Sequence, residues 1–140
     1  MGADVNVQNA NGDINEQIKQ IEYFIEKGMD AIVIICIDSD SLTDVVKKAK
    51  DAGIKIIAYD RLVHNSDVDL YISFDNYEVG ELMGKSLVDN GLAGGNVIMI
   101  GGNVADDNVH QVEEGFINVM DKNSVQVIGS MHAEGWRAEA

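Results

Sequence analysis

The stretch AIVIICIDSDSLTDVVKKAKDAGIKIIAY, residues 31–59, decides the fold class. It begins with an apolar run, 31–37, that does not alternate with polar residues, which is typical of a strand buried on both faces of a parallel sheet. A helix ending at Asp51 is predicted next, followed by a second strand over 54–59. A strand, a helix and a parallel strand form a βαβ unit, so the stretch predicts an α/β fold.

The same alternation continues on both sides of this stretch. Further strands are predicted over 4–8, 70–74, 97–100 and 125–130, and further helices over 14–27, 77–90 and 108–121. Asp13 is expected to cap the first helix, and Asp40 or Ser41 the second. In the helix over 77–90, the inner side is expected to carry Leu82, Leu87 and Val88. The sequence therefore predicts a series of βαβ units around parallel sheets.

The charge balance limits what the protein binds. Acidic residues outnumber basic residues by 24 to 10, which gives a formal net charge of −14 and argues against binding to nucleic acid or anionic lipid. A neutral or cationic ligand fits better. The single cysteine, Cys36, is expected to be a small buried hydrophobic residue. Apolar runs are far shorter than the ~20 residues of a membrane-spanning helix, and no secretory signal is expected at the start of the chain.

The sequence contains no pattern typical of catalysis or metal binding. His64, His110 and His132 lack metal-ligand spacing and cysteine partners, so solvated or hydrogen-bonded histidines are predicted and no metal site. The glycine pairs at 94–95 and 101–102 do not fit a phosphate-binding loop and are interpreted as turn glycines. No Ser-His-Asp arrangement occurs at a plausible spacing. The protein is therefore predicted not to be an enzyme and to need no cofactor.

Polar side chains gather just beyond the carboxyl ends of the predicted strands, where ligands bind open α/β sheets. These residues are Asp38 and Asp40, Asp60 and Arg61, Asp106 to Asn108, and Trp136 and Arg137. Each group has an ordinary alternative: helix caps for the first and third, a surface ion pair for the second, and packing for the tryptophan. Taken together, these residues suit a sugar ligand. Their carboxylate, guanidinium and amide groups can bond sugar hydroxyls, and the indole ring can pack on the apolar face of a sugar.

Four segments also resemble a known family. They are QNANGDINEQIKQIEYFIEKGMDAIVI (8–34), VVKKAKDAGIKIIAYDRLV (45–63), DVDLYISFDNYEVGELMGKSLVDNG (67–91) and residues 101–115. They resemble the sugar-binding solute receptors of bacterial ABC transport, which have the type I periplasmic-binding fold, and most closely the D-xylose-binding branch. The resemblance covers essentially the whole chain.

The resemblance implies two lobes, joined by hinge strands, that close around a sugar. Residues 1–74 would be part of the first lobe, without its opening strand and helix, and residues 75–140 the first half of the second lobe. Residues 70–76 would form the first crossing between the lobes. The chain is therefore expected to be a truncated, bilobal piece of about half a receptor. Because strands 4–8 and 31–37 would then face each other across a gap, self-association of the truncated chain is expected.

By the same resemblance, Asp60 and Arg61 are expected to bind the sugar from the first lobe, and Asp106 and Asn108 from the second. Trp136 is expected to be the stacking aromatic residue. Asp107 stands where relatives often carry asparagine.

The function implied is extracytoplasmic binding of a monosaccharide, D-xylose or a related pentose. The expected partner is an ABC permease or the sensor domain of a membrane histidine kinase. The alternative from another class is a receiver-like phosphorelay domain or small α/β regulatory domain whose acidic strand ends hold Mg²⁺. The effector domain of a repressor is a third interpretation, although the chain contains no DNA-binding helix-turn-helix.

Overall fold

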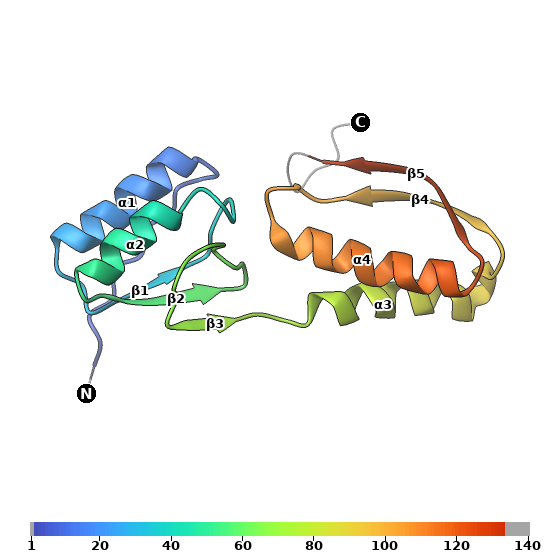
Figure 1. Cartoon of the computed structure of the whole chain (residues 1–140), viewed down its shortest axis with the longest axis horizontal. Coiled ribbons are helices and arrows are strands. Elements are labelled where there is room, and N and C mark those ends of the chain that lie inside the picture. Colours follow the sequence, from blue (N-terminus) through green and yellow to red (C-terminus); the bar gives the residue numbers. More distant parts are fainter. Residues whose placement is uncertain (1, 134–140) are drawn as a thin grey trace. The chain divides into compact units, whose positions relative to one another are not determined.

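The computed structural model describes residues 2–133 (Figure 1). The chain divides into two compact units, unit 1 (Met1–Ile72) and unit 2 (Ser73–Ala140). The division lies close to the boundary expected after residue 74. The assignment of the two units to the first and second lobes of a receptor stays a prediction.

Unit 1 is a parallel sheet with helices on one face (Figure 1). Its elements are α1 (Ile14–Glu26), β1 (Ala31–Ile34), α2 (Thr43–Asp51), β2 (Lys55–Tyr59) and β3 (Leu70–Ile72). The strands lie in the order β1-β2-β3, and both pairs are parallel, with Ile32 opposite Ile56 and Ile57 opposite Leu70. The βαβ unit predicted from residues 31–59 is therefore confirmed.

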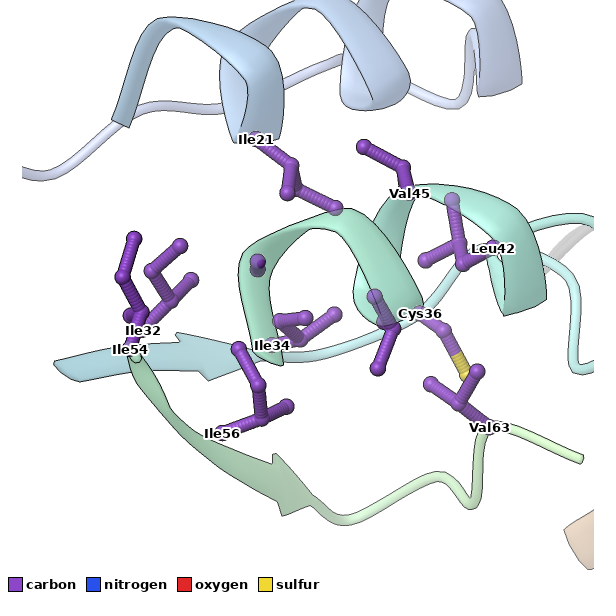
Figure 2. Packing of buried hydrophobic residues seen from close by; sticks show 11 residues of the cluster. Ile21, Ile32, Ile34, Cys36, Leu42, Val45, Ile54, Ile56 and Val63 are labelled. Carbon is purple, nitrogen blue, oxygen red and sulfur yellow. The ribbon is translucent and has the colours of Figure 1, made fainter. Parts of the chain in front are cut away.

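The core of unit 1 lies between its sheet and its helices (Figure 2). Ile32, Ile34 and Ile56 of the strands are almost fully buried, and Leu42 packs in the same cluster. Each of these side chains stabilises the fold by about 1.5–3 kcal/mol on leaving water. Cys36 also joins this core with no exposed surface, as its place in an apolar run predicted.

The strand predicted over 31–37 is shorter than expected and has one open face. β1 ends at Ile34, and burial alternates along it, so that Val33 and Ile35 are 61% and 54% exposed. The reason is that α1 and α2 pack on the same face of the sheet. In the described part of unit 1, no element packs on the opposite face, so the prediction of a strand buried on both faces is wrong.

Residues 4–8, predicted as the first strand, form no strand. Val5 and Val7 are highly exposed, and β1 pairs only with β2 among the described strands. An alternating apolar pattern becomes a strand only where a neighbouring strand completes its hydrogen bonds. The following helix begins as predicted, because the Asp13 side chain accepts a hydrogen bond from the backbone N–H of Glu16 at 3.1 Å.

The start of α2 differs from the prediction that Asp40 or Ser41 caps it. The helix begins at Thr43 without a side-chain cap. Asp38 instead caps the preceding turn: its Oδ1 accepts from the N–H of Asp40 at 3.0 Å and from the N–H and Oγ–H of Ser41 at 2.7 and 2.6 Å. The bond from the Ser41 hydroxyl is the main reason that the pKa of Asp38 lies below its ordinary value.

Unit 2 combines a pair of parallel strands with helices. Its elements are α3 (Asn76–Leu87), a short π-helical turn η1 (Val88–Leu92), β4 (Asn96–Gly101), α4 (Asp107–Lys122) and β5 (Gln126–His132). β4 and β5 are parallel, with Asn96 opposite Gln126, and Val119 and Met120 of α4 are buried in the core. Within residues 2–133, no helix is long and apolar enough to cross a membrane.

Glycines bring α3 and α4 very close together. A Cβ atom at Gly80 would fall on the carbonyl oxygen of Val112, and one at Gly115 would fall on the carbonyl oxygen of Tyr77. A side chain at either glycine would therefore push the helices apart.

This packing corrects the predicted inner side of α3. Leu82 and Leu87 are 57% and 41% exposed, whereas Gly80 and Gly84 are buried. The side of α3 that meets α4 is the side with glycines, because only a surface without side chains allows the backbones to approach this closely. Of the predicted inner residues, Val88 does pack against the core.

One carboxylate joins α2, β2 and the segment before β3. Asp69 accepts hydrogen bonds from Lys50 Nζ at 2.8 Å, from Lys55 Nζ at 2.9 Å and from the backbone N–H of Ile56 at 2.9 Å. The Lys50 ammonium is the largest cause of a pKa of Asp69 far below its ordinary value. Because the folded pKa is depressed, the ionised side chain stabilises the fold above its ordinary pKa and loses this contribution in acid.

We expect Asp69→Asn to lower the melting temperature at neutral pH and to reduce its dependence on pH in acid. In the unchanged chain, the Asp69 contribution is complete above roughly pH 5 and falls as the pH drops through and below the ordinary aspartate value of ~3.9. Thermal unfolding followed between neutral and acidic pH measures this. Asp67→Asn is the control, because the Asp67 side chain is 96% exposed and its carboxylate lies 3.8 Å from Lys50 Nζ, beyond hydrogen-bonding distance. Equal pH dependence in the two variants would contradict the expectation.

Candidate ligand-binding site

Asp60 lies at the carboxyl end of β2 in an unusual backbone conformation. Its φ is +66°, in the left-handed region that non-glycine residues seldom occupy. The N–H of Arg61 donates to the carbonyl oxygen of Tyr59 at 2.8 Å, which closes a tight γ-turn around Asp60. The N–H of Asp60 donates to the carbonyl oxygen of Ile72 at 2.8 Å and so fixes the turn to β3. Such strained turns often lie at functional sites.

The Arg61 side chain reaches across to the end of β1. Its Nη1 donates to the carbonyl oxygen of Cys36 at 3.2 Å. The Cys36 thiol in turn donates to the carbonyl oxygen of Leu62 at 3.4 Å. The segments that follow β1 and β2 are therefore bonded to each other through Cys36, and the guanidinium lies at this shared edge of the sheet.

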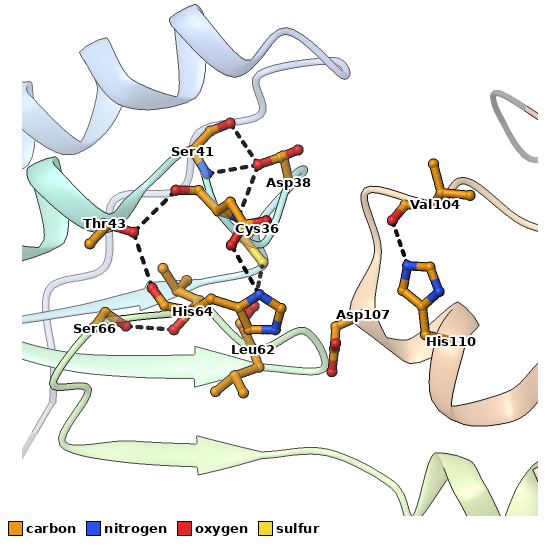
Figure 3. A network of polar contacts seen from close by, with 12 residues as sticks. Cys36, Asp38, Ser41, Thr43, Leu62, His64, Ser66, Val104, Asp107 and His110 are labelled. Carbon is orange, nitrogen blue, oxygen red and sulfur yellow. Dashed lines mark hydrogen bonds and ion pairs between the residues drawn. The ribbon is translucent and has the colours of Figure 1, made fainter. Parts of the chain in front are cut away.

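A polar network extends this connection (Figure 3). Thr43 Oγ1 lies 3.1 Å from the carbonyl oxygens of both Asp40 and His64, and His64 Nδ1 lies 3.1 Å from Asp40 Oδ1. The N–H of His64 also donates to the carbonyl oxygen of Ser39 at 2.7 Å. Asp40 therefore holds the loop after β2 instead of capping α2, and the network restrains the loop that carries Asp60 and Arg61.

In unit 2, Asp106 and Asn108 lie where α4 begins after β4. Asp106 is 9% exposed and caps α4, because its side chain accepts from the N–H of Asn108 at 3.1 Å. The Asn108 side chain is held by Asn76, whose Nδ2 donates to its Oδ1 at 3.0 Å. This bond turns the N–H groups of Asn108 away from Asn76. The helix-cap interpretation of Asp106 is confirmed, and a cap does not exclude ligand binding by the second carboxylate oxygen.

Asn76 was not predicted as part of this group. It is 8% exposed at the start of α3, with a side chain that reaches Asn108 far along the chain. The available signal was the pair Asp75-Asn76 directly after a predicted strand.

Asp107 and the glycines at 101–102 have structural roles. The Asp107 carboxylate accepts a hydrogen bond from Gln111, one turn further along α4. Gly101 and Gly102 are not turn glycines with positive φ, because neither is among the residues in that region. A Cβ atom at Gly102 would lie 2.9 Å from Val109 Cγ2, and one at Gly101 would fall on Glu113 Oε1. Close approach of α4 explains these glycines.

Each histidine has a polar partner within hydrogen-bonding distance, in agreement with the prediction of hydrogen-bonded histidines. Besides His64, His110 Nε2 lies 2.9 Å from the carbonyl oxygen of Val104, and His132 Nε2 lies 2.8 Å from Glu113 Oε1. Between residues 2 and 133, no group of three or more His, Cys, Asp or Glu side chains could hold a metal ion. Trp136 and Arg137 lie outside the described residues, so the predicted stacking role of Trp136 stays a prediction.

The parallel strands and the helices packed on them define an α/β protein. The family described as the periplasmic binding protein domain matches residues 1–140. The chain belongs to the periplasmic binding protein family. This membership places it outside the receiver-like class that the sequence left open.

Relatives and solved structures agree with this family. The chain is 43% identical over 143 residues to the D-xylose-binding periplasmic protein of Escherichia coli, covering 99% of the chain and 43% of the relative. The chain thus spans less than half the length of this relative. A fructose-binding periplasmic domain of a hybrid two-component system has a TM-score of 0.90 at 25% identity, covering 97% of the chain and 45% of that domain.

A further solved structure contains a sugar. It is an ABC transporter solute-binding protein from Clostridium phytofermentans with bound β-D-glucose, with a TM-score of 0.76 at 36% identity. The match covers 86% of the chain and 40% of that protein. These neighbours share the type I fold of parallel strands and helices that the chain shows.

Proposed function

We propose that this chain forms part of a monosaccharide receptor whose ligand is D-xylose. The observation that carries the proposal is the position of Asp60 and Arg61 in unit 1 and of Asp106 and Asn108 in unit 2. Asp60 and Arg61 directly follow β2, and Asp106 and Asn108 lie at the start of α4, after β4. Hydrogen bonds hold the side chains of Arg61, Asp106 and Asn108 in these positions. The choice of xylose is supported by the D-xylose-binding relative, which is more similar in sequence than the fructose-binding and glucose-bound neighbours.

The chemistry of these side chains suits a neutral polyhydroxylated ligand. Carboxylates accept hydrogen bonds from sugar hydroxyls, and the Arg61 guanidinium donates several in fixed directions. Asn108 does both. Trp136, by the family resemblance, would add an apolar ring to pack on the C–H face of the sugar. These groups bind and orient a sugar without a chemical step, so no cofactor enters the proposal.

Calorimetry on a receptor of the relatives' length that contains this chain tests the proposal. The titrants are D-xylose, D-ribose, D-glucose and D-fructose. We expect D-xylose to bind most tightly, by about tenfold or more over the hexoses, which corresponds to ~1.4 kcal/mol. Tighter binding of another sugar would overturn the choice of xylose. No binding of any sugar would overturn the proposed function.

The partner is proposed to be an ABC permease or a membrane sensor kinase, and the location extracytoplasmic. The support is that relatives are named as periplasmic proteins and that the structural neighbours include both an ABC transporter protein and a two-component system. Pull-down of the sugar-loaded receptor against a permease and a kinase sensor domain separates the two. Binding to the permease alone would indicate transport, and binding to the kinase alone would indicate signalling.

The 140-residue chain by itself is expected to self-associate and to bind D-xylose weakly or not at all. Val33 and Ile35 on the open face of the first sheet are exposed, and so are Ile98, Ile100 and Ile128 on the second. Exposed apolar surface of this kind favours association. Light scattering should give a mass about twice that of one chain or more. A stable monomer that binds D-xylose with roughly micromolar affinity would contradict this expectation.

A further inference from the structure

Gln17 of α1 bonds the backbone directly beyond the end of β1. Its Nε2 donates to the carbonyl oxygen of Ile35 at 2.8 Å, and its Oε1 accepts from the N–H of Ile37 at 3.0 Å. The ladder between β1 and β2 ends at Ile34, so these backbone groups lie outside the paired part of the sheet. The Gln17 amide supplies the donor and the acceptor that a neighbouring strand would otherwise provide.

The segment that Gln17 holds is the same segment that Arg61 bonds. The N–H of Ile37 and the carbonyl group of Cys36 belong to one planar peptide unit, in which the two groups point in opposite directions. Gln17 accepts from the N–H side of this unit, and Arg61 Nη1 donates to the carbonyl side at 3.2 Å. Gln17 and Arg61 therefore bond opposite sides of the same peptide plane. The bond to Gln17 helps to fix the direction of the carbonyl group to which Arg61 donates.

Cys36 makes the link rigid. Its side chain has no exposed surface, and its thiol bonds the carbonyl oxygen of Leu62, the neighbour of Arg61. The peptide plane between Cys36 and Ile37 is thus held by a buried side chain, by Gln17 and by the loop after β2. Loss of the Gln17 amide would remove the bond on the N–H side of the plane, and we expect this to loosen the direction of its carbonyl group.

We infer that Gln17 is a positioning residue that fixes the Arg61 guanidinium for sugar binding. This inference rests on the proposed function for its effect on affinity, but the contact chain also exists without sugar. Gln17 is only partly buried and is not part of the hydrophobic core of unit 1, so its side chain could otherwise be replaced with little effect on the core. Gln20, one turn further along α1, is the matched control, because its Nε2 bonds the carbonyl oxygen of Asn9 at 3.2 Å, away from Arg61.

The first test needs no sugar. In the 140-residue chain, hydrogen exchange at the Ile37 amide and the ¹⁵N–¹H signals of the Arg61 guanidinium are compared between the unchanged chain, Gln17→Leu and Gln20→Leu. We expect exchange at Ile37 to become about tenfold faster in Gln17→Leu, with broadened Arg61 signals, and no such change in Gln20→Leu. Unchanged Ile37 exchange and Arg61 signals in a folded Gln17→Leu chain would overturn the inference.

The second test measures affinity in a receptor of the relatives' length. We expect Gln17→Leu to weaken D-xylose binding by about three- to tenfold and to have no added effect in an Arg61→Ala background. Full additivity of Gln17→Leu and Arg61→Ala would overturn the inference. If the unchanged receptor binds no sugar, the proposed function fails while the first test still decides the role of Gln17.

Discussion

Replacement of Arg61 by alanine is expected to weaken D-xylose binding by a full-length receptor about tenfold or more. The side chain lies across the ends of β1 and β2 and would donate charge-assisted hydrogen bonds to sugar hydroxyls. Loss of a hydrogen bond to a charged group costs about 1.5–3 kcal/mol, which is this factor or larger. Calorimetry gives the affinity, and circular dichroism checks that the variant is folded.

Arg61→Lys serves as the control for charge. Lysine keeps the positive charge but not the planar fork that bonds the Cys36 carbonyl and a ligand in fixed directions. We expect most of the affinity to be lost in this variant as well. Affinity within about twofold of the unchanged receptor in Arg61→Ala would remove Arg61 from the site.

The carboxylate of Asp106 offers the matching experiment in unit 2. Asparagine is also a good helix cap, so Asp106→Asn removes the charge and keeps the cap of α4. Alanine removes both functions and should also cost about 0.5–2 kcal/mol of stability. We expect both variants to lose D-xylose affinity by about tenfold, and only Asp106→Ala to melt at a lower temperature. Retained affinity in Asp106→Asn would exclude the carboxylate from ligand binding.

Substitution of Gly115 by alanine is expected to destabilise unit 2 by about 3 kcal/mol. The new Cβ would fall on the carbonyl oxygen of Tyr77 in α3, a backbone atom that moves only with its helix. Gly80→Ala should have a similar effect, because its Cβ would fall on the carbonyl oxygen of Val112. Denaturant unfolding measures the free energy.

Gly129→Ala is the matched control in the same unit. A Cβ atom at Gly129 would come no closer than 4.0 Å to the Ile98 side chain, and Gly129 does not have a positive φ. We expect its effect to stay within about 0.5 kcal/mol. Equal stability of Gly115→Ala and Gly129→Ala would show that the two helices separate at no cost.

Much of the fold could be predicted from local patterns. The cap at Asp13 and the glycine after α1 define that helix, and the apolar run after them defines β1. The patterns failed where the outcome depends on a distant neighbour. Residues 4–8 alternate like a strand but pair with none of the described strands, and Val33 remains exposed because both helices pack on the opposite face.

The buried side of α3 shows a different limit. Hydrophobic periodicity selects the face with the largest apolar side chains, and on that basis Leu82 and Leu87 were expected inside. The structure packs the face with Gly80 and Gly84, because close approach of two backbones needs small residues more than large ones. A sequence pattern that counts only apolar bulk does not detect such a contact.

The candidate site could be predicted in part, for a reason of topology. The carboxyl ends of parallel strands lie at one edge of a sheet, so the positions of Asp60, Arg61 and Asp106 follow from the strand prediction. The residues that hold them could not be predicted in the same way. Gln17 and Asn76 act through side-chain bonds to groups 18 or more positions away, and nothing in their local sequence indicates the partner.

The most direct test of the proposed receptor function is to map the effect of D-xylose on the backbone amide signals of the full-length receptor. Binding at the strand ends predicts that the largest shifts occur at residues 59–63 in unit 1 and at residues 103–109 in unit 2. Saturation with D-xylose that leaves both loops unchanged, while calorimetry records binding, would contradict the location of the site. No shift at any residue, together with no heat of binding, would contradict sugar recognition itself.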